Sequence, residues 1–462
     1  MSLQPDDYPR TLDELQATFT SGHTRPLTWR RDQLAAVERM LRDNEERFNA
    51  ALQDDLGKPA QEVLLGETAL LFSEIRHARR KLKRWMRPRR TFTPLIGQPA
   101  RSWVQPEPLG VVLIIGAWNY PVQLVVGPLI AALAAGNCAI VKPSEIAAAT
   151  SGLLAELVPQ YLDQAAVRVV EGAVEETTAL LKLRFDHIFY TGGAAVGRIV
   201  MRAAAEHLTP VTLELGGKSP CVIDAGADMD SAARRLVWGK CLNAGQTCIA
   251  PDYVLVAGTD SDRDRLVGAI ERELEAMYGD DRLASADYSK IINRRHFDRL
   301  VGYLDNGRIA TGGRHDSQTL RIEPTVVVDV PQDAAVMREE IFGPVLPVIS
   351  VDSLDAAIEY IGRGAKPLSA YLFTRSRESE RTFTHAVSAG NICINDTLMF
   401  MTVPGLPFGG VGDSGMGQYH GRAGFDRLSH LKAVMKRGRW PEMPVRFPPY
   451  TRMKERLLRL LS

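Results

Sequence analysis

A cysteine and a glutamate stand in two short segments where they could carry out chemistry at a carbonyl carbon. Cys248 lies in residues 245–253 (GQTCIAPDY), and Glu214 lies upstream in residues 213–220 (LELGGKSP). A thiolate can attack a carbonyl carbon to give a covalent adduct, and a carboxylate can activate the water that later releases an acid. The two segments therefore predict a nucleophile and its general base.

The local sequence around each group leaves a second interpretation open. Residues 244–247 are small and polar, so the backbone before Cys248 can approach a ligand closely. A free cysteine is nevertheless usually a buried, unreactive thiol. Glu214 ends an apolar strand, where desolvation would raise the pKa of its carboxyl toward the range of a general base, although a paired or solvated carboxylate is commoner.

An asparagine follows the first of several short apolar strands. Asn119 comes after residues 111–115, at the edge where open α/β sheets bind their ligands. Its side-chain amide could donate to a developing oxyanion, with the Cys248 backbone N–H as a second donor. An asparagine before Pro121 could equally serve a turn or a helix cap.

Two other strand ends could hold a nucleotide. Residues 191–197 (TGGAAVG) follow a strand and open a helix, so free N–H groups at the helix start could receive a pyrophosphate. The segment is not GxGxxG, and glycine-rich turns without ligands are common. Lys142 and Glu145 follow another strand, where they could hold a ribose by its hydroxyls or form a solvated surface turn.

Short apolar strands alternate with longer amphipathic helices after a helical region that ends near Arg90. This alternation predicts an α/β fold with a parallel, doubly wound sheet, followed by a second α/β domain whose boundary lies near residues 216–217. Strands are expected at 111–115, 139–142, 167–171, 187–191, 211–215, 253–256, 325–330, 345–351 and 370–374, and helices at 151–162, 194–207, 231–243 and 262–277.

Composition narrows the class of protein. The 462 residues suggest roughly three domains, and the net charge of +1 favours neither nucleic acid nor an anionic membrane as partner. The basic run 79–90 is therefore expected to be a solvated helix end. Five cysteines without a CxxC pair indicate reduced thiols, and residues 1–8 lack the features of a signal peptide, so a cytoplasmic protein is expected.

Two segments could suggest a membrane. Residues 111–141 carry no charge, but Pro and Gly divide them, which favours a buried strand–helix–strand unit over a bilayer span. The basic, leucine-containing residues 450–462 could lie on a membrane surface, but docking on the protein itself is the favoured interpretation.

Together these segments resemble the aldehyde dehydrogenase superfamily, in particular the class 3 branch with its fatty, aromatic and coniferyl aldehyde dehydrogenases. Residues 213–220 resemble the glutamate motif of the family and residues 245–253 its cysteine motif. Asn119 falls at the oxyanion asparagine. Residues 340–344 (EIFGP) resemble the segment that contacts the nicotinamide, and residues 407–421 (PFGGVGDSGMGQYHG) are the run most typical of class 3.

The resemblance implies an aldehyde-dehydrogenase-like fold with a Rossmann-type cofactor domain and an α/β catalytic domain. It assigns residues 1–81 and 101–213 to the cofactor domain, 214–393 to the catalytic domain, 82–100 and 394–430 to a small β bridging or oligomerisation element, and 431–462 to a tail. A homodimer is expected, with the segment after Ile394 as interface. Because the chain stops at Ser462 without a hydrophobic anchor, no stable membrane attachment is expected.

The resemblance also implies the reaction: NAD(P)-dependent oxidation of medium-chain aliphatic or aromatic aldehydes to acids, through a thiohemiacetal and a thioester on Cys248. NAD is expected as cofactor, with NADP possible, and no metal is implied. Asn119 would stabilise the oxyanion and Glu214 would activate water. The residues implied in cofactor binding are Lys142, Ser144, Glu145, Gly192, Gly193, Gly197, Leu215, Gly216, Glu340 and Phe342.

Two positions depart from the family pattern. Gly193 stands where many relatives have serine, which removes one side-chain hydrogen bond to the phosphate, and Ala117 replaces the usual proline before the Trp-Asn pair. Three alternatives remain: an acylating relative that uses coenzyme A, a catalytically silent binding or structural protein, and a cysteine hydrolase. The presence of Glu214 argues against the first, since acylating enzymes usually dispense with this glutamate, and no histidine is tied by a motif to Cys248 as the third requires.

Overall fold

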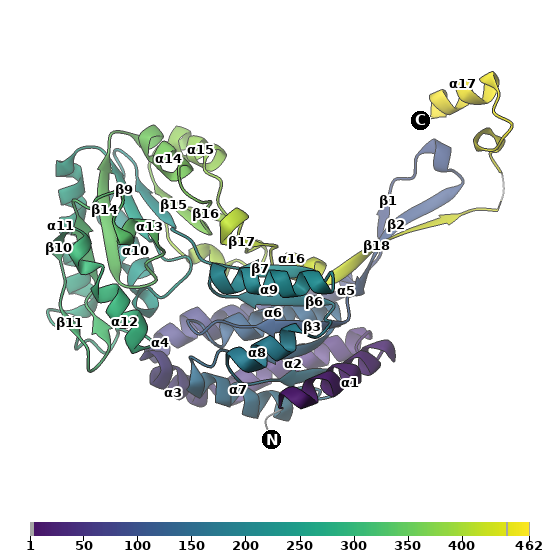
Figure 1. Cartoon of the computed structure of the whole chain (residues 1–462). Helices are drawn as coiled ribbons and strands as arrows, with labels where there is room; N and C mark the ends of the chain where they lie inside the picture. The colour runs from purple at the N-terminus through teal and green to yellow at the C-terminus, as the bar shows by residue number, and fades with distance from the viewer. Residues whose placement is uncertain (1–3, 440–441, 462) are drawn as a thin grey trace.

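The computed structural model describes residues 4–439 and 442–461, whose strands form a six-stranded sheet, a seven-stranded sheet, a three-stranded sheet and a small hairpin. The first two sheets lie in two α/β units side by side, and the three-stranded sheet forms an arm that projects from them (Figure 1). The hairpin pairs β11 (His315–Asp316) with β12 (Arg321–Ile322).

The first unit contains a doubly wound parallel sheet. Its strand order is β17-β7-β6-β3-β4-β5, so the chain direction across the sheet reverses between β3 and β6. Ligands of open α/β sheets bind at such a reversal, beyond the carboxyl ends of the strands. The strands are β3 (Val111–Ile115), β4 (Cys138–Lys142), β5 (Val167–Val169), β6 (His187–Thr191) and β7 (Val211–Glu214), with β17 (Gly415–Met416) antiparallel at the edge.

Helices cover this sheet. The crossover helices are α6 (Gln123–Ala135), α7 (Ala148–Tyr161), α8 (Val174–Leu181) and α9 (Ala194–Glu206). The amino-terminal helices are α1 (Tyr8–Thr20), α2 (Leu27–Asp43), α3 (Glu45–Leu56), α4 (Ala60–Val63) and α5 (Ala69–Trp85), with a π-helical turn η2 (Leu64–Thr68) between the last two. Because α6 is buried along its whole length between β3 and β4, the uncharged segment 111–141 is confirmed as a strand–helix–strand unit.

The second unit has strand order β10-β13-β14-β9-β8-β15-β16, parallel except for β10. Its strands are β8 (Pro220–Ile223), β9 (Tyr253–Ala257), β10 (Arg308–Thr311), β13 (Thr325–Val328), β14 (Val345–Val351), β15 (Ser369–Phe373) and β16 (Asn391–Ile394). Its helices are α10 (Met229–Cys241), α11 (Asp260–Tyr278), α12 (Arg294–Val301), α13 (Ala335–Arg338), α14 (Leu354–Gly362) and α15 (Arg377–Ala386).

The expected fold class is confirmed, and most expected elements agree within a few residues. The strands 187–191 and 345–351 have the expected bounds. The helix expected over 231–243 ends instead at Cys241, because the backbone leaves the helical region at Leu242, whose ψ is 128°, and Asn243 and Ala244 follow with left-handed φ angles of 53° and 51°. β8, β10 and β16 were not expected: β8 begins at a proline, and the other two lack a buried apolar pattern.

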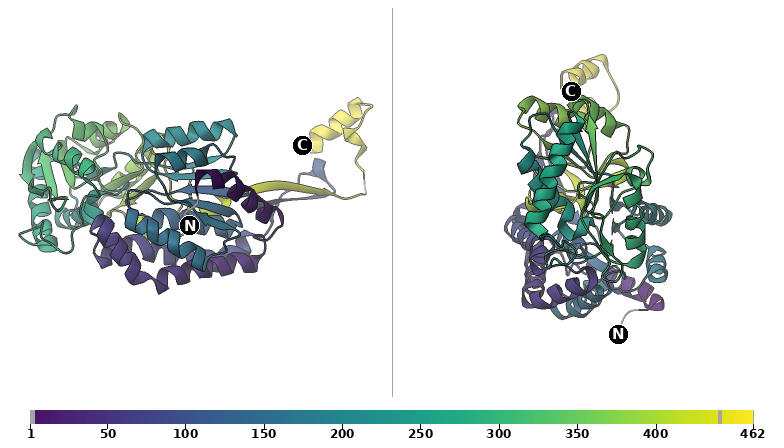
Figure 2. Two further views of the ribbon diagram at one scale, coloured as in Figure 1. Left: turned by 60° about the horizontal axis from the view of Figure 1, so that its bottom comes forward. Right: turned by 90° about the vertical axis from the view of Figure 1, so that its left-hand side faces the viewer.

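The arm consists of β1 (Arg89–Thr91), β2 (Ala100–Pro108) and β18 (Ser429–Arg437), all antiparallel. α16 (Gly421–Arg427) leads into β18, and α17 (Arg452–Leu461) lies at the far end of the arm (Figures 1 and 2). Short helical turns are η1 (Pro5–Asp7), η3 (Leu95–Gly97), η4 (Leu242–Gly245), η5 (Leu304–Asn306), η6 (Met399–Thr402), η7 (Gly412–Ser414) and η8 (Pro444–Arg446). Among the described residues, no helix is long and apolar enough to cross a bilayer.

Candidate active site

Cys248 lies in a strained loop between α10 and β9. Asn243, Ala244 and Gly245 all have positive φ angles, of 53°, 51° and 75°. A Cβ on Gly245 would lie 2.3 Å from the Gly343 carbonyl oxygen, so this position requires glycine. Such strain persists only where the surrounding structure holds it, and it is concentrated at functional sites. Here the turn reverses the chain and directs Cys248 toward a pocket.

Gln246 is the side chain that holds this loop. Its Nε2 donates to the carbonyl oxygens of Asn243 and Lys290, both at 3.0 Å, and its Oε1 accepts the N–H of Ile292 at 3.0 Å. Asn243 adds a bond from its Nδ2 to the Gln246 carbonyl at 3.1 Å. Neither side chain was expected from the sequence to be functional. The position of Gln246 within the cysteine segment was a signal that could have identified it.

Asn119 reaches the same loop from the first unit. Its Nδ2 donates to the Gln246 carbonyl oxygen at 3.0 Å, which leaves the second N–H of the amide for a ligand. The neighbouring Tyr120 hydroxyl lies 2.7 Å from Thr247 Oγ1. The residue before α6 is Val122, so Asn119 does not cap that helix. The structure therefore brings Asn119 beside the cysteine loop.

Glu214 ends β7 and is buried. Within the described part of the chain, neither of its carboxyl oxygens has a hydrogen-bond partner. Burial raises the pKa of this carboxyl well above its usual range, and the positive charge of Arg427 offsets only part of that rise. A carboxyl in this state resembles a general base more than a surface ion pair.

The Cys248 thiol is half-buried, whereas Cys138, Cys221 and Cys241 are buried. Burial raises the pKa of Cys248, and the nearby carboxyls of Glu340 and Glu214 raise it further. The backbone N–H groups of Cys248 and Ile249 point toward the sulfur and offset part of this rise. The thiol therefore needs a proton acceptor before it can attack, and it lies close to two carboxyls.

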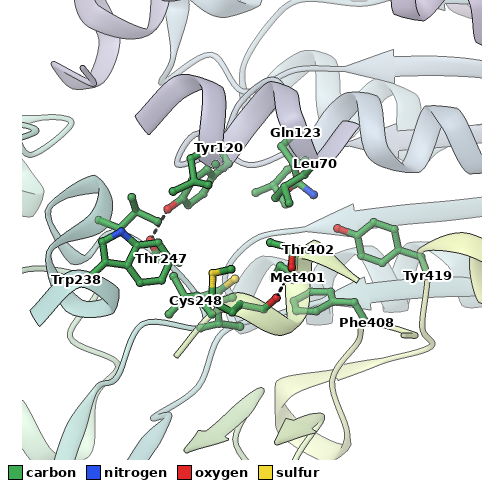
Figure 3. Close-up of a pocket in the computed structure, with 17 residues that line it drawn as sticks. Leu70, Tyr120, Gln123, Trp238, Thr247, Cys248, Met401, Thr402, Phe408 and Tyr419 are labelled. Carbon is green, nitrogen blue, oxygen red and sulfur yellow. Dashed lines mark hydrogen bonds between the residues drawn. The ribbon is translucent and has the colours of Figure 1, made fainter. Parts of the chain in front are cut away.

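A pocket of about 70 Å³ opens onto Cys248. Tyr120, Trp238 and Phe408 contribute aromatic rings to its lining, and Tyr419 lies across the pocket from Trp238 (Figure 3). Its lining is almost entirely apolar, so it suits a hydrocarbon chain or a ring that presents an electrophilic carbon to the sulfur.

A larger cavity of about 490 Å³ lies between the two units, lined in part by Ala194, Gly216 and Glu340. A Cβ on Gly216 would lie 1.9 Å from Glu340 Oε2, so a glycine is needed for the two segments to meet. Glu340 Oε1 is buried without a partner among the residues that the structure covers. Burial raises the pKa of the Glu340 carboxyl to about 8, and the charge of Asp252 adds to the rise.

The amino end of α9 fits an anionic ligand at this cavity. No side chain of the described residues caps this end, so its first N–H groups are free to bind one. Apart from its chain neighbours, no heavy atom of the described residues lies within 4 Å of the point that a Gly193 Cβ would occupy. A Cβ on Gly197 would lie 2.8 Å from the Leu215 side chain, so this glycine lets α9 pack against the strand end. The turn therefore suits a pyrophosphate.

Of the remaining expected residues, Lys142, Ser144 and Glu145 lie at the carboxyl end of β4 in the first sheet, and Phe342 lies before β14 in the second unit. Lys142 ends β4, two strands from β6, and its Nζ donates to Glu145 at 3.0 Å and to the Pro143 carbonyl at 3.1 Å. Ser144 lies between them. Phe342 lies against Trp118 with their ring centroids 5.3 Å apart.

One buried cation was not expected from the sequence. Lys240 Nζ, on α10, is buried and has no hydrogen-bond partner within residues 4–439 and 442–461. Burial lowers the pKa of this ammonium to about 8. No sequence signal distinguished Lys240 from a surface lysine, because its neighbours in the chain belong to an ordinary amphipathic helix.

Comparison with known proteins gives full-length relatives. A family model described as the aldehyde dehydrogenase family matches residues 2–434. The chain is 48% identical to aldehyde dehydrogenase family 3 member H1 of Arabidopsis thaliana, over 97% of this chain and 94% of the relative. It is 45% identical to the dimeric NADP-preferring aldehyde dehydrogenase of Rattus norvegicus, over 95% and 98%. The substrate-bound structure of Staphylococcus aureus AldH superposes with a TM-score of 0.95 at 41% identity, covering 98% of this chain and 99% of that one.

Proposed function

The chain belongs to the aldehyde dehydrogenase family and oxidises aldehydes with NAD(P), and on that premise we propose that Cys248 is the nucleophile, Glu214 the base and Asn119 the oxyanion donor. The observation that carries the proposal is the convergence of these three side chains on one loop. The half-buried thiol of Cys248 lines the apolar pocket, and the side chain of Asn119 donates a hydrogen bond to the same loop. The charge of Glu214 is close enough to raise the pKa of the thiol.

The first half of the reaction forms a covalent adduct. Cys248 Sγ gives its proton to water and attacks the aldehyde carbon as the thiolate, so that a C–S bond forms, the C=O π bond breaks and the carbonyl oxygen becomes an oxyanion. The free N–H of the Asn119 amide and the backbone N–H of Cys248 donate to that oxyanion. NAD(P), when bound, supplies the acceptor for the hydride that the aldehyde carbon then loses. A thioester remains on Cys248.

The second half releases the acid. Glu214 takes a proton from a water molecule that attacks the thioester carbon. The C–S bond breaks, the carboxylic acid leaves, and Cys248 is free for another aldehyde. The unpartnered oxygens of Glu214 within the described chain support this role, because such a carboxylate can accept a proton without first breaking an ion pair.

The cofactor would be held along the edge of the first sheet. The free amino end of α9, with Gly192 and Gly193, would receive the pyrophosphate, and Lys142 and Glu145 would hold a ribose. Glu340 and Phe342 would contact the nicotinamide end. The proposed domain division is residues 1–81 and 101–213 for the cofactor, 214–393 for the chemistry, 82–100 and 394–430 for the bridging element, and 431–462 for the tail. The arm strands β2 and β18 continue beyond the bridging bounds, to Pro108 and Arg437.

The apolar lining of the pocket supports medium-chain aliphatic or aromatic aldehydes as substrates. A spectrophotometric panel of such aldehydes, run with NAD and with NADP, tests the proposal by the formation of reduced cofactor. If no aldehyde of either class reduced either cofactor, the assignment would be wrong. Product analysis with and without coenzyme A distinguishes release of the acid from transfer of the acyl group.

Replacing Glu145 by glutamine should shift cofactor use toward NADP. The carboxylate of Glu145, paired with Lys142 at 3.0 Å, would repel a 2′-phosphate on the ribose that it holds. We expect the ratio of kcat/KM for NADP to that for NAD to rise about 10-fold, measured from initial rates. Glu175→Gln, an exposed charge change on α8, is the matched control. An unchanged ratio would show that Glu145 does not select the cofactor.

We further propose a cytosolic homodimer joined through the arm, as in the relative named dimeric. Large apolar side chains are exposed on the arm, at Phe92 and Leu95, and on α17 at its far end, at Met453 and Leu460. Light scattering should give about twice the chain mass of 51.0 kDa. Phe92→Ser with Leu95→Ser should shift the mass toward one chain, whereas Leu208→Ser, an exposed leucine outside the arm, should not. A wild-type mass of one chain would contradict the dimer.

A further inference from the structure

We propose that Lys58, in the loop between α3 and α4, and Glu67, in the turn η2, form a buried ion pair whose two members act as positioning residues that hold Asn119 in its oxyanion-binding orientation. The inference rests on the proposed function of Asn119. Lys58 is 1% exposed and Glu67 is fully buried. Neither side chain lines the apolar pocket, and their contacts lead to the loop between β3 and α6.

Lys58 holds the backbone of this loop directly. Its Nζ donates to Glu67 Oε1 at 2.7 Å and to the carbonyl oxygen of Asn119 at 2.8 Å. The same ammonium lies 3.9 Å from the centroid of the Tyr120 ring, a cation–π distance. Since Tyr120 also bonds to Thr247, the lysine contacts two consecutive residues that both reach the cysteine loop.

Glu67 holds the other side of the loop. Its Oε2 accepts the N–H groups of Val122 at 3.2 Å and Gln123 at 2.8 Å, which are the first free N–H groups of α6. A carboxylate is stabilised there by the positive end of the helix dipole. Lys58 and Glu67 therefore bind the chain on both sides of Tyr120 and Pro121, and they restrain the whole turn from Asn119 into α6.

The segment that supplies Glu67 has an unusual backbone. Glu67 lies in the π-helical turn η2, between α4 and α5. Such turns are rare and occur often at functional sites. A Cβ on Gly66 in the same turn would lie 2.9 Å from Tyr120 Cε1, so the turn also brings its backbone against the oxyanion loop. The π-helical turn η2 therefore brings both Glu67 and Gly66 into contact with the loop between β3 and α6.

Asn119 is fixed by three bonds in this arrangement. Its carbonyl oxygen accepts Lys58 Nζ and also Asn243 Nδ2 at 2.9 Å, while its own Nδ2 donates to Gln246 at 3.0 Å. Because the backbone and the side chain of Asn119 are both held by hydrogen bonds, its remaining amide N–H is fixed in one orientation. A displacement of about 1 Å at such a donor can reduce a rate about 100-fold.

A purely structural role is the competing interpretation. Buried ion pairs contribute little net stability, because the desolvation of both charges offsets their attraction, and an apolar pair of the same shape often serves the fold as well. Replacing both charges with neutral residues of similar shape therefore separates the two roles. The variants are Lys58→Met alone and Lys58→Met combined with Glu67→Gln.

The test measures the rate constant of the first NADH burst, before turnover. We expect both variants to slow this burst by about 10- to 100-fold, in the same step as Asn119→Ala, because the oxyanion forms before hydride transfer. Alkylation of Cys248 by iodoacetamide should change less than about three-fold, since neither residue contacts the thiol.

Arg30→Met is the matched control. Arg30 is also a buried cation, and its NH1 donates at 3.1 Å to the Ala134 carbonyl at the opposite end of α6, about 20 Å from the oxyanion loop. We expect this variant to keep the wild-type burst while losing thermal stability, because it removes a comparable buried bond from the same helix.

Three results would overturn the inference: a wild-type burst in folded variants of the pair, an equal loss in Arg30→Met, or unfolding of both pair variants, which would assign the pair to stability. Failure of the proposed function looks different. In that case the wild-type protein forms no reduced cofactor from any aldehyde, or Cys248→Ala still forms it, whatever the residue at position 58.

Discussion

Cys248→Ala is expected to abolish aldehyde-dependent formation of reduced cofactor, with kcat/KM lowered about 10⁴-fold or more. Without the sulfur, no covalent adduct forms and the thioester pathway is closed. No other thiol can replace it, since Cys138, Cys221 and Cys241 are buried and Cys393, in β16, does not line the pocket. Absorbance of the reduced cofactor measures the loss, and unchanged thermal unfolding shows that the protein is folded.

Cys393→Ala is the matched control for this substitution. Cys393 is half-buried like Cys248 and has a raised pKa, about 11, but it lies in β16 and not at the pocket. The control should keep wild-type activity, and iodoacetamide should inactivate it as it does the wild type. Activity that persisted in Cys248→Ala would remove the nucleophile from the proposal.

The pH dependence of Cys248 alkylation follows from its surroundings. Burial and the carboxyls of Glu340 and Glu214 raise the pKa of this thiol, so its proton is retained to higher pH than that of an exposed cysteine. Only the thiolate reacts, and the alkylation rate of the free protein should therefore rise with pH through the range above neutrality.

The second large effect is expected for Glu214→Gln, which should slow steady-state turnover by about 10²- to 10⁴-fold while sparing the first hydride transfer. Glutamine keeps the shape of the side chain but cannot take a proton from water, so the thioester accumulates on Cys248. Rapid mixing should show a burst of about one reduced cofactor per site, followed by almost no further product. Equal loss of burst and turnover would contradict a role in deacylation.

The pH profile of turnover tests the same residue independently. Because burial raises the pKa of Glu214, its carboxyl stays protonated to higher pH than an exposed glutamate. The base must be ionised to accept a proton, so wild-type turnover should fall as the pH drops through this raised pKa. The glutamine variant should lack that limb. A wild-type profile without any ionisation above the usual carboxyl range would count against Glu214 as base.

Much of the fold follows from local pattern. The alternation of apolar strands and amphipathic helices placed β3, β4, β6 and β14 within one residue of their ends, because period and length are properties of neighbouring residues. The pattern did not reveal β8, which begins at Pro220 and has only four residues, or β10 and β16, whose side chains are not buried. These three segments become strands through backbone pairing with neighbouring strands, which their own sequence does not indicate.

The sequence motifs identified Cys248, Glu214 and Asn119 as candidates. Their local sequence did not distinguish a catalytic role from an ordinary structural role. Burial removed the solvated interpretation of Glu214, and the bond from Asn119 to Gln246, a residue 127 positions away, removed the helix-cap interpretation. The buried pair of Lys58 and Glu67 carried no sequence signal, since a lysine and a glutamate nine residues apart resemble two ordinary surface charges.

Residue type and order along the chain thus specify which groups can act: a thiol, a carboxyl, an amide and a glycine turn at the start of a helix. Proton affinity, orientation and access depend instead on desolvation and on partners that are distant in the chain. The buried carboxyl of Glu214 lies near the half-buried thiol of Cys248, as their proposed roles require, only because the carboxyl end of β7 meets the loop before β9 when the two sheets come together.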